Sequence, residues 1–106
     1  MTRALFICGK ARMRSPTAAD ICAEQEGMET DFAGLSNDAD EKLSSEQIDW
    51  AEVIFVMEQR QKKRLNALFG DLLHNKRVIC LNIPDRFAYM QPELVDLLRQ
   101  KLHTLL

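Results

Sequence analysis

The chain has 106 residues, of which 46% are hydrophobic and 28% charged, so it can bury one compact core and leaves little room for a second. We therefore expect a single domain over residues 1–106. The net charge of −2 argues against the basic surface that binds nucleic acid or anionic lipid by charge alone. The apolar runs are too short for a signal-peptide core or a membrane span, which predicts a cytoplasmic protein without membrane contact.

The cysteine content is low and irregular. Cys8, Cys22 and Cys80 are an odd number in a chain large enough to fold without disulfides, so a disulfide framework is not expected. Their spacing matches no zinc-binding pattern, and the two histidines stand apart from them and from each other. The sequence therefore predicts no metal and no other cofactor.

The first part of the chain predicts a strand, a helix and a second strand. Arg3–Ile7 is a continuous apolar run that indicates a short buried strand. Ser15 followed by Pro16 favours a helix start with Ser15 as the cap, and the helix is expected over Pro16–Gln25. Met28–Ala33 is predicted to be the second strand.

The middle of the chain predicts a loop, a short helix and the clearest strand. Gly34–Lys42 is rich in Asn, Asp and Ser and is typical of a surface loop. Ser44–Asp49 resembles a short helix that begins with a capping box formed by Ser44 and Gln47. Glu52–Met57 is β-branched and aromatic, which indicates a strand.

The next helix is expected over Glu58–Phe69. Leu65, Leu68 and Phe69 are predicted to face inward, and Gly70 is predicted to end the helix as a glycine cap. This helix also carries four cations: Arg60, Lys62, Lys63 and Arg64. A solvated face is their simplest interpretation, and binding of an acidic partner is the alternative.

The last part of the chain predicts a strand over Arg77–Leu81, a loop over Asn82–Gln91 and an amphipathic helix over Pro92–Leu105. Strands that alternate with helices imply a parallel sheet covered on both faces. The predicted fold class is α/β, a three-layer sandwich whose four-stranded parallel sheet is expected in the order 2-1-3-4. Ligands of such sheets bind at the carboxyl ends of the strands, and Cys8 and Asp85 both follow strands.

The segment between the first strand and the first helix has the character of a phosphate site. Free N–H groups and the helix dipole favour an anion at a helix N-terminus. Cys8 is the candidate nucleophile because Arg14 and the helix terminus favour its thiolate form. Arg14 offers a planar fork of donors for two phosphoryl oxygens, and Ser15 is placed to donate to the sulfur. The predicted phosphate-binding residues are Gly9, Lys10, Ala11, Arg12, Met13 and Arg14.

Three stretches of the sequence resemble the low-molecular-weight protein tyrosine phosphatases. They are Leu5-Phe6-Ile7-Cys8 followed after five residues by Arg14-Ser15-Pro16-Thr17-Ala18, then Trp50–Glu58, and then Ile83-Pro84-Asp85 with Phe87. In its short length the chain resembles a compact bacterial branch of predicted phosphatases. The resemblance implies a phosphocysteine intermediate on Cys8, binding of the transferred group by Arg14, and Asp85 as general acid and then base. It implies no metal.

Several residues near the site depart from that family or have more than one interpretation. Lys10, Ala11 and Met13 stand where the family has glycine, asparagine and cysteine, and Ala11 disfavours left-handed backbone. Phe87 and Tyr89 are candidates for a pocket wall that stacks on a phenyl ring, although packing in the core is an equal alternative.

The leading hypothesis is hydrolysis of a phosphate monoester, with a phosphorylated protein or a small aryl phosphate as substrate and phosphotyrosine as the favoured group. Inorganic phosphate or sulfate is expected to bind in the loop. Ala11 motivates a second hypothesis, a noncatalytic module that binds phosphate or phosphoproteins. Arsenate reduction is a weaker third, because it needs two further reactive thiols and Cys22 and Cys80 are predicted to lie in a helix and a strand.

Overall fold

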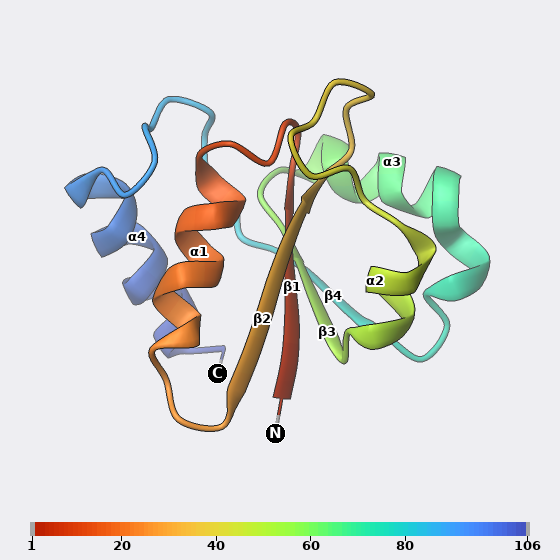
Figure 1. The fold of residues 1–106 in the computed structure, drawn as a ribbon, viewed down its shortest axis with the longest axis horizontal. Helices are drawn as coiled ribbons and strands as arrows, with labels where there is room; N and C mark the ends of the chain where they lie inside the picture. Colours follow the sequence, from red (N-terminus) through yellow and green to blue (C-terminus); the bar gives the residue numbers. More distant parts are fainter. Residues whose placement is uncertain (1, 106) are drawn as a thin grey trace.

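The computed structural model describes residues 2–105 and confirms the predicted alternation of strands and helices (Figure 1). The elements are β1 (Thr2–Cys8), α1 (Arg14–Ala23), β2 (Met28–Gly34), α2 (Ser45–Trp50), β3 (Val53–Val56), α3 (Gln59–Phe69), a 3₁₀ turn (Gly70–Leu72), β4 (Arg77–Cys80) and α4 (Pro92–His103). The four strands form one parallel sheet in the order β2-β1-β3-β4, as expected. The fold is a three-layer α/β sandwich.

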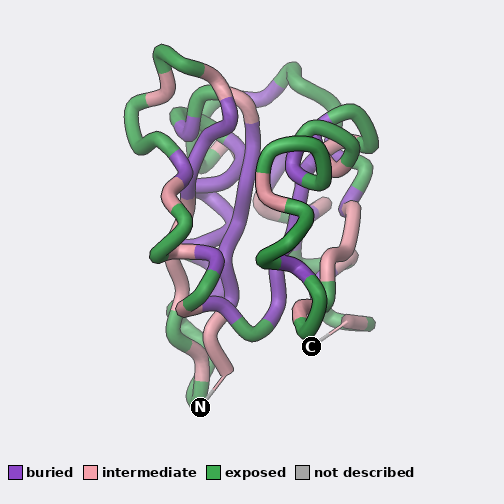
Figure 2. The backbone as a smooth tube through the Cα atoms, turned by 90° about the vertical axis from the view of Figure 1, so that its right-hand side faces the viewer, coloured by how far each residue is buried: buried purple, intermediate pink, exposed green. Residues whose placement is uncertain are grey.

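Alternation along β1 separates the two halves of the core. Ala4 and Phe6 face α1 and α4, whereas Leu5 and Ile7 face α2 and α3. The ring of Phe6 stacks on that of Phe55 in β3, with centroids 5.1 Å apart. Figure 2 shows the buried residues concentrated in the central strands, with exposed residues on the outer helices and loops. A central strand buried on both faces holds its carboxyl end rigidly.

The order of the strands creates one crevice beside the end of β1. The connection after β1 leads to β2 on one side of β1, whereas β3 lies on its other side. The loops that follow β1 and β3 therefore run in opposite directions from the sheet and leave a crevice between them. Figure 1 shows the loops after β1, β2 and β4 gathered at the same end of the sheet. This is the end at which Cys8 and Asp85 were predicted to meet.

The start of α1 differs from the prediction. The helix begins at Arg14 with Met13 as its cap, two residues before the expected start at Pro16, and no side chain caps it. Ser15 was wrongly predicted to be the cap, because its hydroxyl is directed to the sulfur of Cys8 instead. Pro16 is still accommodated in the first turn, where a missing N–H leaves no helical bond unmade.

Two details of α3 also correct the prediction. Leu65 is fully buried, but Leu68 is 54% exposed. Phe69, four residues after Leu65, lies on the same face of the helix and packs beside it. Leu68, three residues after Leu65, lies at the edge of that face and is turned toward solvent. Gly70 ends the α-helix without the left-handed cap that was predicted; its φ is −50° and the chain continues into the 3₁₀ turn.

The capping box of α2 is confirmed. The N–H of Gln47 donates to the Ser44 hydroxyl at 3.3 Å, and the Ser44 N–H donates to the Gln47 side chain at 3.1 Å.

None of the helices within residues 2–105 combines the length and the apolar character that crossing a membrane requires.

Candidate active site

The loop after Cys8 is held through its carbonyl groups. Three carbonyl oxygens in a row accept hydrogen bonds from the segment 35–40: Leu35 N–H donates to Cys8 at 3.1 Å, Ser36 N–H to Gly9 at 2.9 Å and Asp40 N–H to Lys10 at 2.9 Å. In a trans peptide the C=O and the following N–H point in opposite directions. The N–H groups of Gly9, Lys10 and Ala11 therefore point away from that segment. The Ala11 N–H donates to the Cys8 sulfur at 3.2 Å, as this geometry requires.

Gly34, the last residue of β2, lets the two segments approach this closely. A Cβ atom at this position would lie 2.6 Å from the Gly9 carbonyl oxygen and 2.7 Å from the Cβ of Ala39. Both distances are shorter than real carbon contacts, so no other residue fits without movement of the backbone. The sequence analysis missed Gly34; a glycine between a strand and a polar segment was the only signal for it.

Ala11 lies in the left-handed region that the sequence analysis considered unfavourable for alanine. Its φ is 59°, and the residue is only 3% exposed. This conformation costs an L-residue roughly 1–2 kcal/mol. The bonds on the neighbouring carbonyl groups and the bond to the Cys8 sulfur hold the backbone there without a polar side chain at position 11.

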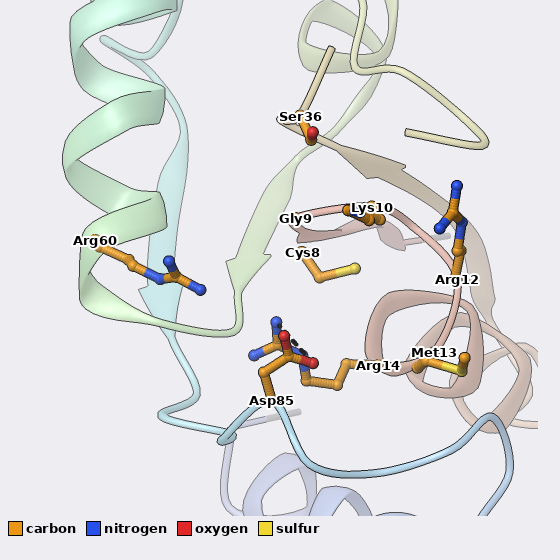
Figure 3. Close-up of a pocket in the computed structure, with 9 residues that line it drawn as sticks. All are labelled: Cys8, Gly9, Lys10, Arg12, Met13, Arg14, Ser36, Arg60 and Asp85. Carbon is orange, nitrogen blue, oxygen red and sulfur yellow. Dashed lines mark ion pairs between the residues drawn. The ribbon is translucent and has the colours of Figure 1, made fainter. Parts of the chain in front are cut away.

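The Cys8 side chain ends among hydrogen-bond donors. Its Sγ lies 3.0 Å from the Ser15 hydroxyl and 3.2 Å from the Ala11 nitrogen. Cys8 lines a cavity of about 340 Å³. The cavity is lined by Cys8, Gly9, Lys10, Arg12, Met13, Arg14, Ser36, Arg60 and Asp85 (Figure 3). An N–H donor and a hydroxyl therefore lie within hydrogen-bond distance of this one sulfur.

Arg14 is buried and fixed in place. Its Nη1 donates to Glu58 Oε1 at 2.6 Å and to the Ile83 carbonyl at 2.8 Å. Its Nη2 lies 3.7 Å from Asp85 Oδ1, the ion pair marked in Figure 3. The guanidinium therefore enters the cavity from a position set by β3, β4 and α1 together, so its side chain has little conformational freedom left to lose on binding a ligand.

Glu58 is a residue of the site that the sequence analysis did not identify. It follows β3 and binds both Arg14 at 2.6 Å and Arg60 at 3.0 Å. Partial burial raises the pKa of Glu58, but the hydrogen bonds and charges of Arg60 and Arg14 outweigh it and hold the pKa below its usual value. An acidic residue at the carboxyl end of a strand was the available signal.

Asp85 lies on the cavity from the loop after β4. Its side chain is 66% exposed, so it is open to solvent on the side away from Arg14. The loop is attached to α1 through Thr17, whose hydroxyl donates to the Met13 carbonyl at 2.7 Å and accepts from the Met90 N–H at 2.9 Å. Thr17 therefore fixes the Asp85 loop relative to the end of the Cys8 loop, a role that the sequence analysis also missed.

The structure does not bring the two candidate wall residues to this cavity. Phe87 is 8% exposed and belongs to the core beneath α1 and α4, with the Arg86 guanidinium 5.2 Å from the centre of its ring. Tyr89 is exposed and its hydroxyl donates to Asp20. This hydrogen bond raises the pKa of Tyr89.

Two ion pairs join the Cys8 loop to the segment 35–40. Lys10 Nζ lies 3.2 Å from Asp38 Oδ2, and Arg12 Nε lies 2.9 Å from Asp40 Oδ1. Hydrogen bonds from Ser36 and Lys10 lower the pKa of Asp38, and the bond to Asp40 raises the pKa of Arg12. All four side chains are largely exposed, so the pairs position charge at the rim of the cavity more than they stabilise the fold.

The other two cysteines lie away from the cavity. Cys22 is fully buried in the core on the α1 side, and burial raises its pKa to about 11. Cys80 packs on the opposite side of the sheet, and its thiol donates to Asn82 at 3.3 Å. Within residues 2–105, no three His, Cys, Asp or Glu side chains are grouped so that they could hold a metal ion.

Comparison with solved structures gives the same fold over nearly the whole chain. The YwlE arginine phosphatase from Geobacillus stearothermophilus has a TM-score of 0.76 and 22% identity, over 98% of this chain and 94% of that one. The Wzb protein of Vibrio vulnificus, solved with benzylphosphonate, has a TM-score of 0.80 and 15% identity, over 98% and 96%. The low-molecular-weight protein tyrosine phosphatase from Streptococcus pyogenes has a TM-score of 0.79 and 14% identity, over 99% and 91%.

These likenesses identify the fold as that of the low-molecular-weight protein tyrosine phosphatases, as the sequence motifs indicated. No family model matches the sequence, and no curated protein matches it either.

Proposed function

We propose that this protein hydrolyses phosphate monoesters through a phosphocysteine intermediate on Cys8. The observation that carries the proposal is that Cys8 and the buried Arg14 line one cavity. The Cys8 sulfur also lies within hydrogen-bond distance of the Ala11 N–H and the Ser15 hydroxyl. A phosphoryl group has three oxygens that need donors, and the Arg14 guanidinium with the N–H groups of the Cys8 loop would supply them beside a nucleophile.

In the first step the Cys8 thiolate attacks phosphorus and the bond from phosphorus to the leaving oxygen breaks. Arg14 and the loop N–H groups bind the three equatorial oxygens, while the Asp85 carboxylic acid gives its proton to the leaving oxygen. In the second step the Asp85 carboxylate takes a proton from water as that water attacks phosphorus. The sulfur leaves as a thiolate, which the Ser15 hydroxyl stabilises, and inorganic phosphate is released.

The substrate class that we propose is a phosphorylated protein, with phosphotyrosine first and a small aryl phosphate as its simplest mimic. Support comes from neighbouring structures named as tyrosine phosphatases and from one neighbour that holds benzylphosphonate. Because another neighbour is named as an arginine phosphatase, a phosphoarginine peptide belongs in the same substrate panel.

The first test is hydrolysis of para-nitrophenyl phosphate in the presence of EDTA. We expect turnover by the native chain and none by Cys8→Ser, with Cys80→Ser as a matched control because that thiol lies across the sheet and should leave the rate unchanged. Rapid acid quench followed by peptide mass spectrometry should find the phosphate on Cys8. Full activity of Cys8→Ser would refute the nucleophile assignment.

A noncatalytic phosphate-binding module is the second candidate, favoured by the alanine in a left-handed conformation at position 11. In this case inorganic phosphate would bind in the loop and raise the melting temperature, with a gain of about 2.7 kcal/mol at a hundredfold excess over Kd. Phosphate-dependent stabilisation without turnover of any substrate in the panel would select this candidate over the first.

A further inference from the structure

A second hollow adjoins the Cys8 cavity and is basic. It lies between α3 and the segment 35–37, with a volume of about 800 Å³. It is lined by Gly9, Leu35, Ser36, Asn37, Arg60, Gln61, Lys63, Arg64 and Ala67. We call it the basic groove, because three of these residues are cations and none is an acid. Gly9, Ser36 and Arg60 line both hollows, so the groove opens into the candidate active site.

Two of the three cations are free to meet a ligand. Arg60 is bound to Glu58 at 3.0 Å and points toward the Arg14 and Asp85 pair in Figure 3. Lys63 and Arg64 are exposed, and neither takes part in an ion pair within the part of the chain that the structure describes. In a chain with a net charge of −2, two such cations beside a third in one groove form a local positive field.

Gln61 supplies an independent observation on the wall of the groove. Its Oε1 accepts hydrogen bonds from the N–H groups of Met57 and Glu58, both at 3.0 Å, which fixes the orientation of the amide. Its Nε2 is buried and, among the described residues, has no acceptor. Buried donors without a partner are uncommon in folded proteins. Gln61 lines the groove, so an unsatisfied donor lies just below the surface that a ligand would contact.

We propose that the basic groove binds an acidic segment of a protein substrate that flanks the phosphorylated residue. The proposal rests on the proposed function, since it places the phosphoryl group beside Cys8 and lets the substrate chain continue past Arg60 to Lys63 and Arg64. Carboxylates of that segment meet the two free cations. Binding energy from such remote contacts selects among substrates that carry the same phosphoryl group.

The placement of the cations divides the run on α3 into two groups. Arg60, Lys63 and Arg64 line the groove, whereas Lys62 does not, although it lies between them in the sequence. The same charge change can therefore be made inside and outside the groove on one helix. Lys62→Glu is the matched control for Lys63→Glu and Arg64→Glu.

The kinetic test compares phosphotyrosine peptides with acidic, neutral and basic flanks. We expect the acidic peptide to have the highest kcat/KM, and Lys63→Glu with Arg64→Glu to reduce it by about tenfold at low salt. Lys62→Glu should leave this preference in place, and para-nitrophenyl phosphate should be hydrolysed equally by all variants because it does not reach the groove. Added salt should weaken the preference. Equal rates for the three peptides would overturn the proposal.

A binding test separates this proposal from the proposed function. Fluorescence anisotropy of the same labelled peptides with Cys8→Ser needs no turnover. Tighter binding of the acidic peptide, lost in Lys63→Glu with Arg64→Glu, would support the groove even if no substrate is hydrolysed. Equal affinity for acidic and neutral peptides would refute it even in an active phosphatase. Binding of the unphosphorylated acidic peptide as tightly as the phosphorylated one would also refute it, because the groove would then act apart from the Cys8 site.

Discussion

The two sides of the Cys8 loop are held in different ways. On one side the buried contacts belong to the main chain, and the side-chain ion pairs lie exposed at the rim. The carbonyl groups of Cys8, Gly9 and Lys10 accept bonds from the segment 35–40, and Gly34 leaves the space. On the other side a charged side chain makes the contacts, because Arg14 is held by Glu58 and by the Ile83 carbonyl. The main-chain side tolerates changes of residue type as long as the space is kept, whereas the side-chain side depends on particular charged groups.

Removal of the space at Gly34 should cause the largest effect. We expect Gly34→Ala to lower the free energy of unfolding by about 3 kcal/mol, because the added carbon meets a backbone oxygen at 2.6 Å and can be accommodated only by movement of the Cys8 loop. Phosphatase activity should fall with it. The measurement is urea unfolding together with kcat/KM for para-nitrophenyl phosphate.

Gly70→Ala is the matched control for this substitution. A carbon at position 70 meets no atom within 4 Å, and the φ of −50° suits alanine. Its effect should be neutral or stabilising by about 0.4–1 kcal/mol. If Gly34→Ala proved as harmless as Gly70→Ala, the close approach of the two segments would not be what holds the loop.

Glu58→Gln should weaken the side-chain side by a smaller amount. The amide oxygen can still accept a bond from Arg14, but the charge that stabilises the buried guanidinium is lost, for an expected cost of about 1–2 kcal/mol in stability. Arg14 should then sample other positions, so kcat should decrease more than KM increases. Glu26→Gln removes the same charge from an exposed position and is expected to change neither quantity.

The difference in stability between the native chain and Glu58→Gln should depend on pH, because the pKa of Glu58 is lowered in the folded state. A carboxylate whose pKa is lower in the folded state stabilises the fold above its usual pKa of 4.5, and the stabilisation is lost as the pH falls through the lower folded value. The gap in melting temperature between the native chain and Glu58→Gln should therefore be constant near neutral pH and close in acid. A gap that persisted in strong acid would show that packing, not charge, makes the difference.

The sequence predicted the parts of this site that follow from local pattern and topology. The β-branched strands and the strand-helix alternation were enough to place the ends of β1 and β4 together, and with them Cys8 and Asp85. Glu58 and Gly34 were missed because their roles depend on which distant groups they meet. Of the two predictions for Ser15, the helix cap was wrong, whereas its hydroxyl does lie 3.0 Å from the Cys8 sulfur.

The smallest expected effect concerns Ala11 and tests how the main-chain side tolerates an unfavourable conformation. For Ala11→Gly, relief of the left-handed conformation gains about 1–2 kcal/mol. Against this, the freer unfolded chain costs about 0.4–1 kcal/mol and the lost buried methyl about 0.8 kcal/mol. The terms nearly cancel, so unfolding free energy should change by less than about 1 kcal/mol, with activity retained because the N–H to Cys8 remains.

Ala18→Gly makes this result interpretable. Ala18 is fully buried in α1, where the backbone is right-handed and glycine relieves nothing, so the loss of the methyl and the helix penalty should add to about 2 kcal/mol. A large difference between the two substitutions would show that the backbone at position 11 is strained and that the bonds from the segment 35–40 hold it. Equal losses at both positions would instead mean that Ala11 carries no strain, and the loop would owe its shape to the side chain of Ala11 rather than to its main-chain contacts.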